Sequence, residues 1–200
     1  FFFKPPPVPH SLPNLSNSPT NNTMSLYDIP LITSTGEQTR LEQYKGKVLY
    51  IVNVASKCGL TPQYEALQAI ADKYKGDVVV LGFPANNFMD QEPGTDSEIQ
   101  EFCSLKYKVT FPLFKKASVA GEDKQPLFKK LIEMQPECLE RQVMVDRLKG
   151  YGIPTTEAPE VAWNFEKFIV SPDGTKVLRF SPSIVPDDVK VVEAIEKLLA

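Results

Sequence analysis

The stretch that decides the fold runs from residue 47 to residue 83 and reads KVLYIVNVASKCGLTPQYEALQAIADKYKGDVVVLGF. Its first part, Val48 to Val54, is a continuous apolar run, typical of a strand buried on both faces. Thr61 offers an N-cap, and Pro62 suits the first position of a helix with an apolar stripe. The apolar run DVVVLGF then follows. A strand, a helix and a strand within about 35 residues predict a right-handed βαβ unit.

Two hairpins are predicted on either side of this unit. The first joins Leu26 to Leu31 with Gln38 to Leu41 and has Gly36 in its turn. The second joins WNFEKFIV, residues 163–170, to TKVLRF, residues 175–180, through a turn that contains PDG. Both hairpins indicate that antiparallel strands accompany the parallel pair.

Further helices are predicted after a capping-box pattern at Thr95 and Glu98, and over residues 126–134 and 186–199. Residues 137–159 are expected to be irregular and exposed. This order of elements predicts an α/β protein with a mixed central sheet flanked by helices, preceded by an N-terminal β-hairpin.

Composition separates residues 1–23 from the rest of the 200-residue chain. These residues are rich in proline and polar side chains, so we expect a disordered extension: a tag, a read-through product or the remnant of a leader. Residues 24–200 are expected to form one domain. A net charge of −3 argues against a nucleic-acid surface, and no apolar run approaches the roughly 20 residues of a membrane span.

Histidine and cysteine usage limits the chemistry. The single histidine, His10, lies in the extension, which argues against a Cys-His protease, a histidine-ligated haem and most catalytic zinc sites. We therefore expect no metal and no cofactor. Three cysteines, Cys58, Cys103 and Cys138, without C-x-x-C spacing do not suggest a disulfide scaffold. They fit a reducing compartment, and a cytoplasmic location is expected.

Cys58 lies at the junction between the first buried strand and the predicted helix. The N-terminus of a helix carries partial positive charge and free N–H groups, and Lys57 adds a cation next to the thiol. Both features stabilise a thiolate and favour a reactive cysteine. The alternative is a half-buried thiol that fills space at the end of a strand.

Four stretches in this order resemble the signatures of the glutathione peroxidase family: NVASKCGLTPQYEAL, LGFPANNFMDQEPG, EFCSLKYKVTFP and WNFEKF. The resemblance covers nearly all of residues 24–200. It implies a thioredoxin-like fold and a thiol-based peroxidase that reduces hydrogen peroxide and organic hydroperoxides. It also implies an antioxidant role under oxidative stress.

The resemblance also assigns catalytic residues. Cys58 takes the position of the peroxidatic cysteine or selenocysteine, and Trp163 and Asn164 take the positions whose N–H groups point at the reacting sulfur. The second motif departs from the family pattern F-P-C-N-Q-F, because Ala85 and Asn87 replace its cysteine and glutamine. Asn87 keeps an amide donor but is one methylene shorter. It is expected to contribute if it reaches the sulfur.

The third motif matches the family segment that carries the resolving cysteine in thioredoxin-dependent members, which implies this role for Cys103. A Cys58–Cys103 disulfide reduced by thioredoxin is then expected, with glutathione as the weaker alternative reductant. Cys103 also fits a buried helical face, so its helix would have to unravel locally to deliver the thiol. Cys138 matches no motif.

Other functions use the same features. A peroxide sensor that passes oxidation from Cys58 to a client protein shares the first chemical step. A thiol-disulfide oxidoreductase would need a second cysteine near Cys58, and GLTP follows Cys58 without one. A noncatalytic scaffold of the same fold is the third alternative.

Overall fold

The structure is a computed structural model that describes residues 24–200. The predicted extension, residues 1–23, lies outside the described residues. Within the described part, no helix is long and apolar enough to cross a membrane.

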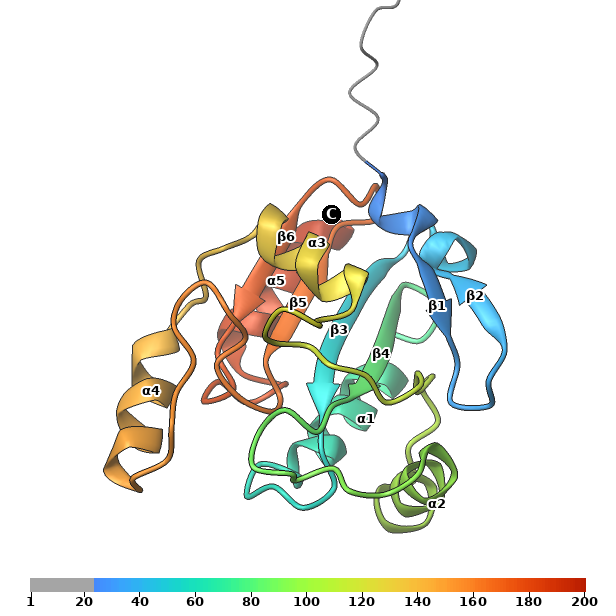
Figure 1. The fold of residues 1–200 in the computed structure, drawn as a ribbon. Coiled ribbons are helices and arrows are strands. Elements are labelled where there is room, and N and C mark those ends of the chain that lie inside the picture. The colour runs from blue at the N-terminus through green and yellow to red at the C-terminus, as the bar shows by residue number, and fades with distance from the viewer. Residues whose placement is uncertain (1–23) are drawn as a thin grey trace, which may run out of the picture.

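A four-stranded mixed sheet in the order β4-β3-β5-β6 forms the centre of the fold (Figure 1). β3 (Val48–Val54) runs parallel to β4 (Val78–Pro84) and antiparallel to β5 (Lys167–Val170). β5 pairs antiparallel with β6 (Val177–Phe180). Every residue of β3 is buried, as its continuous apolar run predicts.

The predicted βαβ unit and N-terminal hairpin are both present. α1 (Gln63–Lys73) connects β3 to β4 and packs against β4. β1 (Pro30–Ile32) pairs antiparallel with β2 (Gln38–Arg40), and Gly36 in the turn has a positive φ of 88°. A left-handed φ of this kind is readily adopted by glycine.

Helices cover both faces of the sheet. α1 and α5 (Val189–Leu199) lie behind it in Figure 1, and α3 (Pro126–Met134) lies in front. α2 (Asp96–Tyr107) follows β4 and begins at the predicted capping box, in which the Thr95 hydroxyl accepts from Glu98 N–H and the Glu98 carboxylate accepts from Thr95 N–H. The mixed sheet, its flanking helices and the hairpin confirm the predicted thioredoxin-like fold.

Residues 137–159 are not wholly irregular, and this prediction was wrong. They contain α4 (Arg141–Gly150), which lies at one side of the molecule in Figure 1. Met144, Val145 and Leu148 form its buried stripe. The helix begins after Glu140, which has a left-handed φ of 58° and makes no side-chain cap bond, so the usual start signal is missing.

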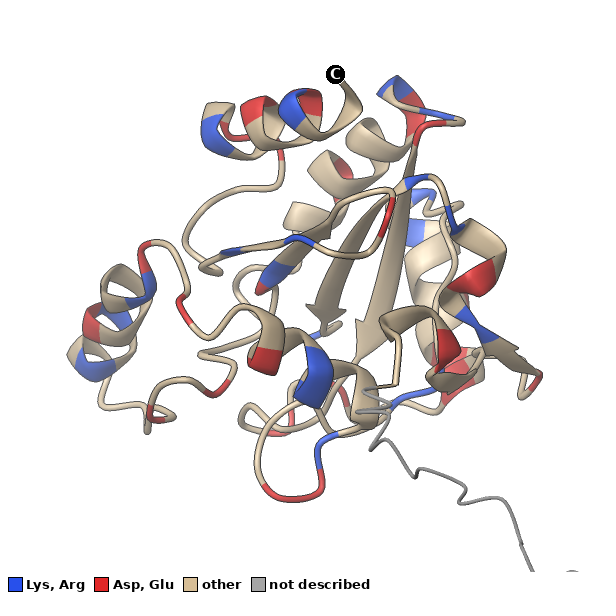
Figure 2. Cartoon of the chain, turned by 90° about the horizontal axis from the view of Figure 1, so that it is seen from above, with Lys and Arg blue, Asp and Glu red and all other residues tan. Residues whose placement is uncertain are grey.

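Charged residues of both signs are interspersed over the helices and loops of the described chain (Figure 2). Both α4 and α5 carry basic and acidic residues in their sequences. Such a mixed surface differs from the single-signed stripe typical of nucleic-acid-binding domains.

Candidate active site

Cys58 lies in the loop that joins the carboxyl end of β3 to α1. Its sulfur Sγ accepts a hydrogen bond from the backbone N–H of Leu60, with an N···S distance of 3.3 Å. The next N–H groups, of Thr61, Gln63 and Tyr64, form successive turns with the carbonyls of the residues three positions earlier. The sulfur therefore lies in the turn that leads into α1 (Gln63–Lys73), within hydrogen-bonding distance of a backbone N–H group.

Thr61 has a different role from the predicted helix cap. Its hydroxyl accepts from Cys58 N–H at 3.0 Å and donates to the Ala55 carbonyl at 2.8 Å. The residue that precedes α1 is Pro62, which makes no side-chain cap bond. The Thr61 hydroxyl is thus used to tie the reactive loop to the end of β3, and it fixes the position of the cysteine backbone.

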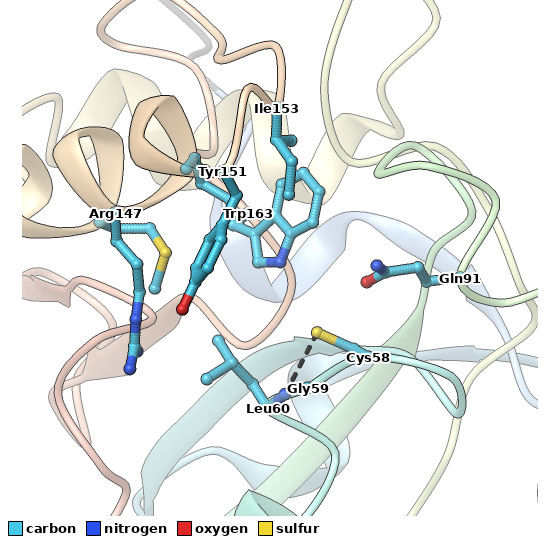
Figure 3. Close-up of a pocket in the computed structure, with 10 residues that line it drawn as sticks. Cys58, Gly59, Leu60, Gln91, Arg147, Tyr151, Ile153 and Trp163 are labelled. Carbon is cyan, nitrogen blue, oxygen red and sulfur yellow. Dashed lines mark hydrogen bonds between the residues drawn. The ribbon is translucent and has the colours of Figure 1, made fainter.

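Cys58 lines a cavity of about 370 Å³, drawn in Figure 3. The cavity wall comes from four separated parts of the chain: residues 58–60, Gln91 after β4, residues 144–153 on and after α4, and Trp163 before β5. Trp163 is 5% exposed and packs at a tilted angle against Phe88. Figure 3 shows its indole nitrogen on the side of the ring that faces the Cys58 sulfur.

Asn53 brings the Trp163 segment to the cysteine. Its side-chain amide donates to the Trp163 carbonyl at 3.1 Å and accepts from Glu166 N–H at 3.0 Å. Its backbone carbonyl accepts from Phe165 N–H at 2.7 Å. A polar residue inside the apolar run of β3 was the available signal, and sequence reasoning did not use it.

Asn164 holds Gln91 in place. The fully buried Asn164 donates from Nδ2 to Gln91 Oε1 at 2.9 Å, and the Gln91 carbonyl accepts from Lys57 N–H at 3.0 Å. Because its carboxamide oxygen is occupied, Gln91 has its NH₂ group left to donate. Figure 3 shows the carboxamide end of Gln91 directed into the cavity between Trp163 and Cys58.

Asn87 is not brought to the sulfur, contrary to the expectation that it could contribute. Its amide donates to Ser118 Oγ at 2.9 Å and to the Ala120 carbonyl at 3.3 Å, and it accepts from Val119 N–H at 2.9 Å. These three hydrogen bonds occupy both the Nδ2 and the Oδ1 of Asn87. They hold residues 118–120 in place, and Asn87 does not line the cavity. Gln91, in place of Asn87, lines the cavity together with Cys58.

The second cysteine lies in a different environment. Cys103 is on α2 and is fully buried. Like Cys58 and Cys138, it is a free thiol. Burial raises the pKa of Cys103 to about 11, and the nearby Tyr64 hydroxyl offsets part of this rise. Cys103 is therefore a protonated thiol inside the folded helix at neutral pH, as the packing interpretation predicted.

A buried ion pair supports the segment that leads to Trp163. Arg179 contacts Glu166 at 2.6 Å, and both side chains are fully buried. Glu166 also accepts from Ala162 N–H, and Arg179 donates to the Glu160 carbonyl. Buried charges of this kind are stable only when paired and hydrogen-bonded. The pair therefore fixes the backbone just before the tryptophan.

Cys138 lies beside this ion pair and outside the cavity. Burial, and then the charge of Glu166, raise the pKa of its thiol to about 12. Such a thiol is protonated and a poor nucleophile at neutral pH. The incidental role expected of Cys138 stays a prediction.

Comparisons with known proteins agree on one family. The model described as glutathione peroxidase matches residues 26–132. Thioredoxin/glutathione peroxidase BtuE of Escherichia coli K12 is 46% identical over 168 residues, which are 82% of this chain and 92% of the relative. Hydroperoxy fatty acid reductase gpx1 of Synechocystis is 42% identical over 182 residues, covering 90% and 97%. A crystal structure of Trgpx in apo form has a TM-score of 0.62 at 35% identity, covering 88% and 97%.

Proposed function

This chain belongs to the glutathione peroxidase family and reduces peroxides, and we propose that it does so with Cys58 as the attacking sulfur. The observation that carries the proposal is the cavity in which Cys58, Gln91 and Trp163 meet, with Asn164 bonded to Gln91. The names of its relatives support hydrogen peroxide and organic hydroperoxides as substrates.

In the first step the Cys58 thiolate attacks one peroxide oxygen and the O–O bond breaks. The sulfur becomes a sulfenic acid, and the second oxygen leaves with a proton as water or alcohol. An ordinary cysteine is roughly 3% thiolate at pH 7, so full ionisation alone gives only about a 30-fold gain. Most of the acceleration must therefore come from donors aimed at the developing charge. Gln91 and Trp163 are placed for this, and Asn164 orients Gln91.

In the second step Cys103 attacks the Cys58 sulfenic acid, a disulfide forms and water leaves. We propose that thioredoxin then reduces this disulfide by thiol exchange, with glutathione as the weaker reductant. Because Cys103 is fully buried on α2, that helix must open locally first. Three free cysteines support a reducing compartment such as the cytoplasm, and we propose that residues 24–200 act as one peroxidase domain.

Turnover with thioredoxin tests the function as a whole. Purified protein with thioredoxin, thioredoxin reductase and NADPH is expected to consume hydrogen peroxide continuously, at a higher kcat/KM than with glutathione and glutathione reductase. The measurement is NADPH absorbance against time. Oxidation that stops after one equivalent with both systems would argue for a sensor, and no oxidation at all would argue for a scaffold.

Gln91 is expected to be the amide that acts on the sulfur. Gln91→Ala should lower the second-order rate constant of Cys58 oxidation by roughly 10²-fold, the usual effect of removing one preorganised donor. The change is measured by stopped-flow mixing with hydrogen peroxide, following Trp163 fluorescence.

The matched comparison is Asn87→Ala, which removes an amide from the same loop. It should lower the melting temperature, since three hydrogen bonds to residues 118–120 are lost, and leave the oxidation rate within about threefold. If Asn87→Ala slows oxidation more than Gln91→Ala at equal folding, the assignment of the donor to Gln91 is wrong.

A further inference from the structure

One wall of the Cys58 cavity is a face of α4 and the residue that ends it. Met144, Arg147, Leu148 and Tyr151 line the cavity, and their spacing of three, one and three residues puts them on a single helical stripe. Figure 3 shows Arg147 and Tyr151 on one side of the cysteine and Gln91 on the other. This wall has no part in the chemistry proposed above.

Arg147 is the one charged residue among those that line the cavity. Its guanidinium forms no ion pair or hydrogen bond within residues 24–200, and neither does the Tyr151 hydroxyl. Arg141 on the same helix differs, because it donates to the carbonyls of Glu160 and Thr156. Arg141 anchors the helix, whereas Arg147 is exposed at the rim of the cavity and its five donors bond to no group within residues 24–200.

The remainder of that wall is apolar. Leu60, Met144, Leu148 and Ile153 line the same cavity as Arg147 and Cys58. A cavity of about 370 Å³ lies within the usual range for small-molecule sites, which bind an apolar body and fix it with few polar groups. Hydrogen peroxide uses neither the apolar wall nor the cation. The wall suits a larger substrate with an apolar body and an anionic end.

We propose that Arg147, with Tyr151, binds the carboxylate of fatty-acid hydroperoxides and so favours free acids over their esters. This inference rests on the proposed peroxidase function and adds a specificity-determining residue to it. Guanidinium and carboxylate match in geometry and charge, and the apolar chain lies along α4 while the hydroperoxide reaches Cys58. The chemical step is unchanged: the thiolate takes one oxygen, and the other leaves as the alcohol of the fatty acid.

The test compares one substrate in two charge states. A linoleic acid hydroperoxide and its methyl ester are mixed with the reduced protein at concentrations where both are monomeric. The second-order rate constant of Cys58 oxidation is then measured by stopped flow in a single turnover, so that no reductant takes part. The wild type is expected to react about tenfold faster with the acid, the effect of one charge-assisted hydrogen bond on a partly exposed site.

Variants assign this preference to a residue. Arg147→Ala is expected to bring the acid-to-ester ratio from about ten to about one, and Arg147→Lys to keep part of the preference because it keeps the charge. The control is Lys149→Ala, which removes an exposed cation from the same helix outside the cavity and should keep the ratio of the wild type. Working with the ratio removes any general effect of a variant on folding or on the reactivity of Cys58.

The possible outcomes distinguish a failure of the carboxylate site from a failure of the proposed peroxidase function. A ratio near one in the wild type, or an unchanged ratio in Arg147→Ala, overturns the carboxylate site while oxidation by hydrogen peroxide still supports the peroxidase. Glutathione-coupled turnover of Arg147→Ala is measured separately, and an unchanged acid-to-ester ratio with slower glutathione-driven recycling would assign Arg147 to the reductant and overturn the proposal as well. A wild type that reacts with neither hydroperoxide nor hydrogen peroxide overturns the peroxidase function itself.

Discussion

Cys58→Ser is expected to abolish peroxide reduction. A serine hydroxyl is not ionised at neutral pH and is a weak nucleophile without an adjacent base, and residues 24–200 contain no histidine to act as one. The donors Gln91 and Trp163 would remain, but the nucleophilic sulfur would be absent. Loss of a nucleophile costs roughly 10⁴-fold or more in other enzymes, so turnover should fall below detection.

The measurement is peroxide consumption in the thioredoxin-coupled assay, with peroxide added in large excess. Folding is followed by thermal unfolding, and little change is expected because serine is close in size to the cysteine and can still accept from Leu60 N–H. Cys138→Ser is the matched control, since it removes a thiol that lies outside the cavity and whose pKa is about 12. Full activity in Cys58→Ser together with loss in Cys138→Ser would move the reaction to the other sulfur.

Much of the fold could be predicted because its signals are local. The apolar run Val48 to Val54 and the capping box at Thr95 depend on neighbours within a few residues. α4 escaped prediction because its buried stripe holds three residues and its start has no capping side chain. Thr61 was misassigned because its hydroxyl hydrogen-bonds to the backbone of Cys58 and Ala55 instead of capping α1.

The site was less predictable, because its contacts join distant segments. Cys58 could be singled out by its position at a helix start, whereas Trp163 and Asn164 were identified through family resemblance. Gln91 was missed because the chain between it and Asn87 turns through Met89 and Asp90, which have left-handed φ values of 53° and 51°. That turn presents Gln91 to the cavity, and no periodic pattern in the sequence indicates it.

Cys103→Ser is expected to separate the two halves of the catalytic cycle. The first oxidation of Cys58 should proceed at the rate of the wild type, since Cys103 does not line the cavity. Recycling by thioredoxin should then fall by roughly 10²-fold. A tethered thiol acts at a millimolar effective concentration, whereas thioredoxin at about 10 μM would have to attack the sulfenic acid directly. Stopped-flow oxidation and NADPH-coupled turnover measure the two halves.

The resolving role also requires a direct observation of the disulfide. Mass spectrometry of the wild type after one equivalent of peroxide should find Cys58 linked to Cys103, and none of this product in Cys103→Ser. Cycling of Cys103→Ser with thioredoxin at the wild-type rate would contradict the assignment, whatever disulfides are found. Glutathione should restore less of the lost turnover than Cys103 provides, because it too must attack from solution.

The pH dependence of this step follows from the burial of Cys103. Its pKa is raised to about 11 by burial, with a further rise from Glu92 and an opposing effect of Tyr64, whereas an exposed cysteine titrates near 8.5. Folded α2 therefore favours the protonated thiol. That contribution to helix stability is complete below about pH 8.5 and is lost as pH rises towards 11. Opening of α2, and with it disulfide formation, should accelerate over this range.

Alkylation of Cys103 by iodoacetamide in Cys58→Ser should accelerate in parallel. An alkylation rate that stays flat from pH 8 to pH 10 would mean that α2 does not control access to Cys103.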